Sequence, residues 1–228
     1  MSKKLFLLLL GLTLLLVNAP AAVAQVHHLT IGLIGDSTVA TTYGWGPAFE
    51  EQCTGEAKVL HFAKNGATLE SLSKRMDELL QYRPDYVIIQ FGHNDQKKYG
   101  PDVYRTKLTS YIQRAKQVGV KPIVFSSVTR RNFGDDGKIQ PRVANLKGDL
   151  PSFAATAEAV AKEQGVPFVD LYRISVNHHN TIGPGASQAY NFNPTDTTHF
   201  SPEGADATAK LIIAALRTEV PELDPFFD

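Results

Sequence analysis

The sequence predicts one α/β domain built on a five-stranded parallel sheet. Apolar runs of strand length alternate with amphipathic runs of helix length along most of the chain, which is typical of a parallel sheet with right-handed helical crossovers. Residues 85–91 form a nearly continuous apolar run, as expected of a strand that is covered on both faces. Polar motifs follow several of these runs, where an open α/β sheet binds its ligands.

Residues 1–24 are predicted to be a cleavable signal peptide. Lys3 and Lys4 precede the apolar run 5–17, and an Ala-x-Ala site follows it, which is the layout of a secretory signal. The apolar run is too short for a membrane anchor, and no cysteine follows it for lipid attachment. Cleavage would leave Gln25 as the first mature residue, in a secreted or periplasmic protein.

Residues 25–228 are predicted to form one domain without a membrane partner. Removing the signal leaves 21 basic and 23 acidic residues without a basic cluster, which argues against nucleic acid as a partner. Cys53 is the only cysteine, so an internal disulfide and a thiolate metal site are excluded. It is expected to be buried as a small apolar side chain.

The first third of the mature chain holds two expected strands and two expected helices. Residues 29–34 and 57–62 have strand composition. Between them a short helix begins near Pro47, a residue that suits the first turn of a helix. A second helix is expected to begin at Thr68, since apolar residues recur after it at steps of three and four up to residue 80.

The middle of the chain continues the alternation. The strand at 85–91 is followed by an amphipathic helix at 101–118 and a strand at 120–128. Residues 129–149 are expected to form a long polar loop with a turn at 135–137.

The last third is expected to close the domain. An Ala-rich helix at 150–164 stops at a glycine, and a fifth strand follows at 166–171, where an early proline favours the sheet edge. Residues 176–195 are interpreted as a loop because they are rich in Asn and contain Gly-Pro-Gly. The last helix spans Pro202 to about Arg217.

Four polar motifs together supply what acyl transfer needs. Ser37 can be the nucleophile, His199 the base that takes its proton, and Asp196 the carboxylate that orients the imidazole. The backbone N–H groups of Ser37 and Gly66 and the side-chain amide of Asn94 can stabilise the oxyanion. Each motif also has a structural interpretation, because Asp36-Ser37 can cap a helix and Gly66 or Asn94 can simply form a turn.

The ordered set resembles the SGNH (GDSL-type) hydrolase superfamily. The matching motifs are Gly35-Asp36-Ser37, Gly66, Gly92-x-Asn94 and Asp196-x-x-His199. Finer details resemble its rhamnogalacturonan acetylesterase branch. These are Thr38 after the serine, Gly44-Trp45-Gly46, Phe91-Gly92-His93-Asn94-Asp95, Arg130-Arg131, Asp136-Gly137-Lys138 and the block from Asp196 to Ser201.

The resemblance implies a flavodoxin-like three-layer αβα sandwich. It implies Ser37 as nucleophile, Asp196 and His199 as its partners, and an oxyanion hole from Ser37, Gly66 and Asn94. The implied activity is removal of O-acetyl groups from a pectic polysaccharide or oligosaccharide without metal or cofactor. One departure concerns the substrate, because the branch often has Gly-Arg-Ser where this chain has Gly66-Ala67-Thr68.

Four further side chains are candidate substrate contacts, each with an alternative role. Trp45 is either a core aromatic or a wall on which a sugar stacks. His93 either makes a structural hydrogen bond or touches substrate. Arg130 and Arg131 either bind a uronate carboxylate or belong to a solvated loop.

Other polar and aromatic clusters are assigned weaker roles. His27-His28 and His178-His179 are adjacent pairs without further ligands, so no metal site is predicted. Tyr190, Phe192 and Asn193 either wall the acyl pocket or order the loop before Asp196.

The sequence therefore predicts a carboxylic ester hydrolase that acts on an acetylated carbohydrate. The alternatives are an acetylxylan or other carbohydrate esterase, a GDSL-type lipase or thioesterase on the same fold, and a non-catalytic sugar-binding protein. The acetylated position and the oligomeric state are left open.

Overall fold

The central sheet of the computed structural model confirms the predicted architecture. The structure describes residues 28–141 and 146–228, so the predicted signal peptide lies outside the described residues. All strand pairs are parallel, and the strand order β2-β1-β3-β4-β5 is the flavodoxin-like order. The strands are β1 (Leu29–Gly35), β2 (Ala57–His61), β3 (Tyr86–Gln90), β4 (Lys121–Phe125) and β5 (Phe168–Val169).

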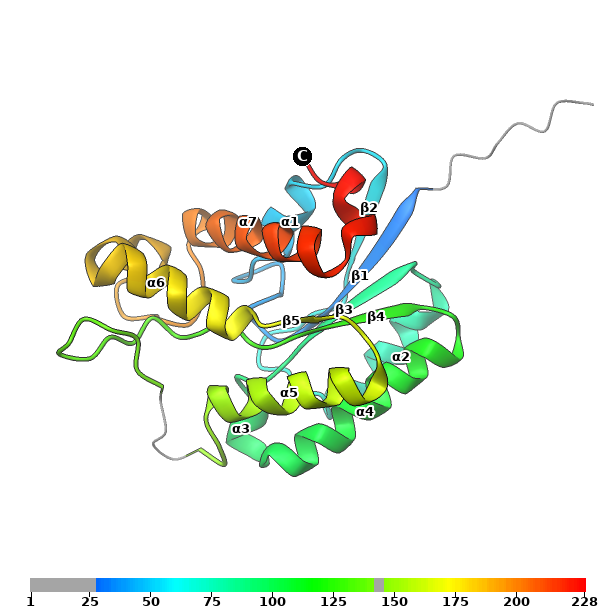
Figure 1. Cartoon of the computed structure of the whole chain (residues 1–228), viewed down its shortest axis with the longest axis horizontal. Helices are drawn as coiled ribbons and strands as arrows, with labels where there is room; N and C mark the ends of the chain where they lie inside the picture. Colours follow the sequence, from blue (N-terminus) through cyan, green and yellow to red (C-terminus); the bar gives the residue numbers. More distant parts are fainter. Residues whose placement is uncertain (1–27, 142–145) are drawn as a thin grey trace, which may run out of the picture.

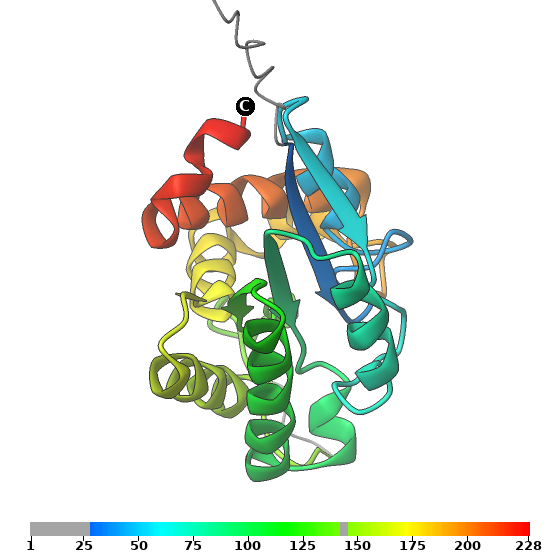
Figure 2. The same cartoon turned by 90° about the vertical axis from the view of Figure 1, so that its right-hand side faces the viewer.

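Helices cover both faces of this sheet and make three layers (Figures 1 and 2). α1 and α7 pack on one face together with the 3₁₀ helix η2, and α2, α4 and α5 pack on the other. The helices are α1 (Gly46–Glu51), α2 (Ser73–Gln81), α3 (Asp95–Lys98), α4 (Pro101–Gln117), α5 (Leu150–Gln164), α6 (Leu171–Ser187) and α7 (Pro202–Glu219), with 3₁₀ helices η1 (Gln188–Tyr190) and η2 (Pro221–Phe226).

Alternate residues of each strand supply the two halves of the core. In β3, Tyr86 and Ile88 face the α1–α7 layer, whereas Val87 and Ile89 face the α2–α4–α5 layer. All four are buried, because successive side chains of a strand point to opposite faces and both faces are covered. The near-continuous apolar run seen in the sequence follows from this double burial.

Several predicted details are confirmed. Pro47 lies in the first turn of α1, and α5 ends at Gly165, whose φ of 59° lies in the left-handed region. The fifth strand occupies the sheet edge, as the proline before it indicated. Cys53, which was expected to be buried, is only half-buried, and this burial is the main cause that raises the pKa of its thiol to about 12.

The helix expected from Thr68 begins later, at Ser73. Residues 68–71 instead form a compact turn, in which the Thr68 N–H donates to Ser71 Oγ at 2.9 Å and the Ser71 N–H donates to Thr68 Oγ1 at 3.1 Å. Hydroxyl groups compete with helical backbone pairing in this way.

The prediction of a loop at 176–195 is wrong over most of that segment. Residues up to Ser187 belong to α6, which extends from the end of β5 past the carboxyl ends of the strands (Figure 1). The Asp170 side chain caps this helix by accepting the Arg173 N–H at 3.1 Å. The Gly183-Pro184 signal marks a kink within the helical segment, with φ of 77° at Gly183.

Within residues 28–141 and 146–228, no helix is both long enough and apolar enough to cross a membrane.

Candidate active site

The nucleophile turn follows β1 and is held by the side chain of Asp36. Its Oδ1 accepts the Thr38 N–H at 2.9 Å and the Thr38 hydroxyl at 2.7 Å. The backbone N–H groups of Val39 and Ala40 both donate to the Asp36 carbonyl. This short-range bonding fixes residues 36–40 as a tight turn, so Asp36 holds the turn rather than capping a helix, since α1 begins only at Gly46.

A buried chain of side-chain hydrogen bonds connects this turn to β3. The Gln90 amide donates to Thr38 Oγ1 at 2.6 Å, and Gln90 Oε1 accepts the Trp45 indole N–H at 3.0 Å. All three side chains are buried. The stacking interpretation of Trp45 is therefore wrong, since its ring is 0% exposed and packs against Phe125 in the core. Gln90 was missed, although it is a polar residue that interrupts the apolar run of its strand.

Ser37, His199 and Asp196 form a continuous hydrogen-bonded relay. The distance between Ser37 Oγ and His199 Nε2 is 2.7 Å, and the distance between His199 Nδ1 and Asp196 Oδ2 is also 2.7 Å. The first distance suits proton transfer from the serine hydroxyl to the imidazole, and the second suits a carboxylate that orients the ring. The structure thus brings together three residues that lie up to 162 positions apart in the sequence.

Asp196 is held in its ionised form by several donors. Its Oδ1 accepts the backbone N–H groups of Thr198 and His199, both at 3.0 Å. Burial raises the pKa of this carboxyl, but hydrogen bonds from the backbone and ring of His199 outweigh burial and leave the pKa below its usual value. The carboxylate can therefore stabilise a positively charged imidazole beside it.

Two buried arginines hold the loop that carries Asp196 and His199. The Arg131 guanidinium donates to the His199 carbonyl and, through Nε, to Asn191 Oδ1 at 2.5 Å. Arg130 Nε donates to Thr198 Oγ1 at 3.2 Å.

Both alternatives considered for these arginines are wrong. Arg130 and Arg131 are 6% and 4% exposed, so they belong neither to a solvated loop nor to an open site for a uronate. Burial lowers the pKa of Arg131 to about 10, and the negative charge of Asp196 opposes that decrease. Arg131 therefore stays charged near neutral pH.

His93, in the loop after β3, is a buried imidazole. It is 2% exposed, and neither ring nitrogen has a hydrogen-bond partner among the described residues. Burial and the nearby positive charge of Arg130 lower its pKa well below the usual value, so the ring is neutral. With this little exposure, the ring offers a substrate little access.

Two of the three expected oxyanion donors, Gly66 and Asn94, lie on loops that are bonded to each other. Asn94 Nδ2 donates to the Ala67 carbonyl at 3.1 Å, and an amide carries a second N–H that is available for another acceptor. Gly66 has a φ of 73°, a conformation that favours glycine. The Asn94 contact therefore places the amide beside the Gly66-Ala67 segment.

Asp95 makes a second connection between the loop after β3 and the segment that follows Gly66. Its buried Oδ1 accepts the Leu69 N–H at 2.9 Å and also the Tyr99 hydroxyl, while the Tyr111 hydroxyl donates to the Leu69 carbonyl at 2.7 Å. Burial raises the pKa of Asp95 to about 6 despite these donors. Sequence analysis did not assign a role to Asp95, although it directly follows the oxyanion candidate Asn94.

The histidine pair in α6 makes hydroxyl contacts. The distance from His178 Nε2 to the Tyr190 hydroxyl is 3.1 Å, and the distance from His179 Nδ1 to Ser187 Oγ is 2.9 Å. Within the described ranges, no group of three or more potential metal-ligating side chains is found.

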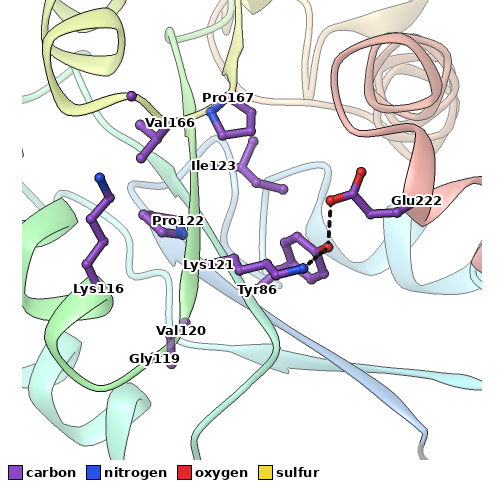
Figure 3. A pocket seen from close by; sticks show the side chains of 11 residues that line it. Tyr86, Lys116, Gly119, Val120, Lys121, Pro122, Ile123, Val166, Pro167 and Glu222 are labelled. Atoms are coloured by element: carbon purple, nitrogen blue, oxygen red, sulfur yellow. Dashed lines mark hydrogen bonds between the residues drawn. The ribbon is translucent and has the colours of Figure 1, made fainter.

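A separate hollow of about 350 Å³ lies near the amino ends of β3 and β4 (Figure 3). There the Tyr86 hydroxyl donates to Glu222 Oε1 at 3.0 Å and accepts from Lys121 Nζ at 3.1 Å. This is the sheet edge opposite the Ser37 relay, whereas ligands of open α/β sheets bind at the carboxyl ends.

A family model described as "GDSL-like Lipase/Acylhydrolase family" matches residues 33–207, most of the chain. The chain belongs to this family. Membership confirms the predicted class of carboxylic ester hydrolase, and the matched region includes every residue of the relay.

Related sequences confirm the resemblance to the rhamnogalacturonan acetylesterase branch. The chain is 33% identical over 210 residues to a rhamnogalacturonan acetylesterase of Bacillus subtilis, covering 81% of this chain and 88% of that protein. It is 28% identical over 226 residues to a rhamnogalacturonan acetylesterase of Emericella nidulans, covering 86% of each.

Solved structures share the fold at lower identity. A Bacillus subtilis protein, YxiM, superposes with a TM-score of 0.73 at 23% identity, over 84% of this chain and 56% of that longer chain. An acetylxylan esterase from Geobacillus stearothermophilus superposes with a TM-score of 0.62 at 18% identity, over 84% of this chain and 93% of that chain. Both confirm the three-layer architecture.

The raised pKa of Asp95 predicts a pH-dependent difference in stability. The pKa of Asp95 is near 4 in the unfolded state and about 6 in the folded state. The folded state therefore binds the proton more tightly than the unfolded state between pH 4 and pH 6. Stability from this group is therefore greatest below pH 4 and declines by about 3 kcal/mol as the pH rises through 6. Asp95→Asn does not titrate, so wild type should lose stability relative to this variant across the window.

Urea unfolding of both proteins at several pH values between 4 and 7 measures this difference. Asp102→Asn, which changes an exposed carboxylate on α4, is the control. Parallel stability curves for wild type and Asp95→Asn would contradict the assignment.

Proposed function

We propose that this protein is a secreted serine esterase that removes O-acetyl groups from a pectic, rhamnogalacturonan-type polysaccharide or its oligosaccharides. The carbohydrate acetylesterase class is supported by the named relatives. The observation that carries the mechanism is the relay from Asp196 through His199 to Ser37, with two contacts of 2.7 Å.

In the first half of the reaction, Ser37 Oγ attacks the acetyl carbonyl carbon while His199 Nε2 takes the hydroxyl proton. The carbonyl oxygen becomes an oxyanion, for which the N–H groups of Ser37, Gly66 and the Asn94 side chain are the assigned donors. The intermediate then expels the sugar oxygen, which receives the proton from His199. An acetyl group remains on Ser37.

In the second half, water replaces the sugar. His199 takes a proton from water as its oxygen attacks the acetyl carbonyl, and a second oxyanion forms at the same donors. Collapse returns the proton to Ser37 Oγ and releases acetic acid. Asp196 stabilises the charged imidazole in both halves, which fits its lowered pKa.

Ser37→Ala is expected to reduce acetate release by about 10⁴-fold or more, because no other group supplies the attacking oxygen. The measurement is acetate release from acetylated rhamnogalacturonan, with thermal unfolding to show that the variant folds. Ser110→Ala, an exposed serine on α4, is the matched control. Turnover close to wild type in Ser37→Ala would refute the nucleophile.

A substrate panel tests the acyl group and the sugar. We expect p-nitrophenyl acetate to be cleaved at least about tenfold more efficiently than the octanoate ester. We also expect more acetate from acetylated rhamnogalacturonan than from acetylated xylan at equal ester content. Preference for octanoate would favour the lipase or thioesterase alternative, and preference for xylan would favour the acetylxylan esterase alternative.

Secretion is proposed from the sequence of residues 1–24 alone. Expression of the full chain in a bacterial host should yield mature protein that begins at Gln25. Mass spectrometry of the intact protein from the periplasm and from the medium measures the cleavage site. Recovery only of uncleaved, membrane-associated protein would contradict this proposal.

A further inference from the structure

A groove of about 290 Å³ lies beside the relay, between the loop after β1 and the start of α7. We call it the Tyr43 groove. It begins where the nucleophile turn ends and reaches the residues that follow His199. The residues that line it include Thr41, Tyr43, Glu51, Phe192, Ser201 and Asp206.

The groove shares its aromatic wall with the relay. The Tyr43 ring lies 5.2 Å from the His199 ring and 4.7 Å from the Phe192 ring, centroid to centroid. The Phe192 N–H donates to the His199 carbonyl at 3.1 Å, and the Tyr43 carbonyl accepts the Phe200 N–H at 3.0 Å. The wall is therefore fixed in position relative to the catalytic imidazole.

Phe192 exposes an apolar ring in this groove. It is 46% exposed and is one of few large apolar side chains with such exposure among the described residues. A ring with this exposure is free to pack against a ligand, and it lies beside the polar groups of the same groove. The C–H face of a pyranose ring is apolar, and it can cover a phenyl ring without burying a hydroxyl.

The opposite rim is acidic and partly fixed. Asp206 Oδ1 accepts Gln52 Nε2 at 2.9 Å, which connects α7 to the end of α1, and its Oδ2 accepts Lys210 Nζ at 2.8 Å. Glu51 is exposed, and none of the ion pairs among the described residues includes it. Carboxylates accept hydrogen bonds from hydroxyl groups, and they repel a second carboxylate.

We propose that the Tyr43 groove is a subsite for an uncharged sugar unit next to the unit that carries the acetyl ester. The inference rests on the proposed function, because it deepens the substrate of the same site. One sugar face packs on Phe192, while its hydroxyls donate to Glu51 and Asp206. A uronate unit is disfavoured in this groove by the carboxylate of Glu51, since Asp206 is already paired with Lys210, and we place it in another part of the substrate path.

The test compares a substrate that fills the groove with one that cannot. Acetylated rhamnogalacturonan oligosaccharide supplies a neutral neighbouring sugar, whereas p-nitrophenyl acetate has none. Phe192→Ala is expected to lower the ratio of kcat/KM for the oligosaccharide to kcat/KM for p-nitrophenyl acetate by about tenfold, through KM. Tyr82→Ala removes another exposed aromatic ring, 66% exposed at the end of α2, and should leave the ratio unchanged.

Glu51→Lys tests the charge of the occupant independently of the aromatic wall. A neutral sugar loses an acceptor, so KM for the oligosaccharide should rise. If a uronate occupied the groove, the new positive charge would lower KM.

Two results would overturn the inference. The first is an unchanged ratio in Phe192→Ala, and if kcat/KM falls equally for both substrates, Phe192 acts through Tyr43 on His199. The second is a lower oligosaccharide KM in Glu51→Lys. Failure of the proposed function itself is distinguishable, because Ser37→Ala would then keep its turnover.

Discussion

The hydrogen-bonded side chain of Gln90 is the constraint on which the site depends. It connects the strand beside β1 to Thr38, and Thr38 in turn bonds to Asp36. A buried amide without partners would cost free energy, so the turn that satisfies Gln90 is strongly preferred over alternatives. Ser37 lies between the two bonded residues of that turn, and its direction toward His199 follows from the network below it.

The two halves of the relay are stabilised in different ways. The nucleophile turn is fixed by short-range bonds and a neutral buried network, whereas the histidine loop is fixed by buried cations. Burying Arg131 carries a desolvation cost, which is visible in its lowered pKa. Its bonds to the His199 carbonyl and Asn191, together with the charge of Asp196, offset this cost. The histidine loop would otherwise be an irregular segment without a rigid element to support it.

The surroundings of the relay differ on its two sides. On the side of the proposed oxyanion donors, Asp95 accepts the Leu69 N–H and Asn94 donates to the Ala67 carbonyl. The other side has aromatic rings and an acidic rim around the Tyr43 groove. Under the proposed function, one face of a substrate would meet hydrogen-bond donors, and the other would meet apolar surface and acceptors. This division suits an ester whose carbonyl must be polarised while its sugar portion is recognised separately.

The sequence by itself determined the sheet, most of the helices and the grouping of Ser37, Asp196 and His199. It could do so because strand burial leaves apolar runs, and because polar motifs after parallel strands meet at one edge. Asp196 and His199 precede the last helix, whose start can reach the same edge. The tertiary structure decided the roles of Trp45, Arg130 and Arg131, since burial depends on which distant segments cover a side chain. It also decided that α6 is helical, because a cap at Asp170 and packing outweigh an Asn-rich composition whose local preference is for turns.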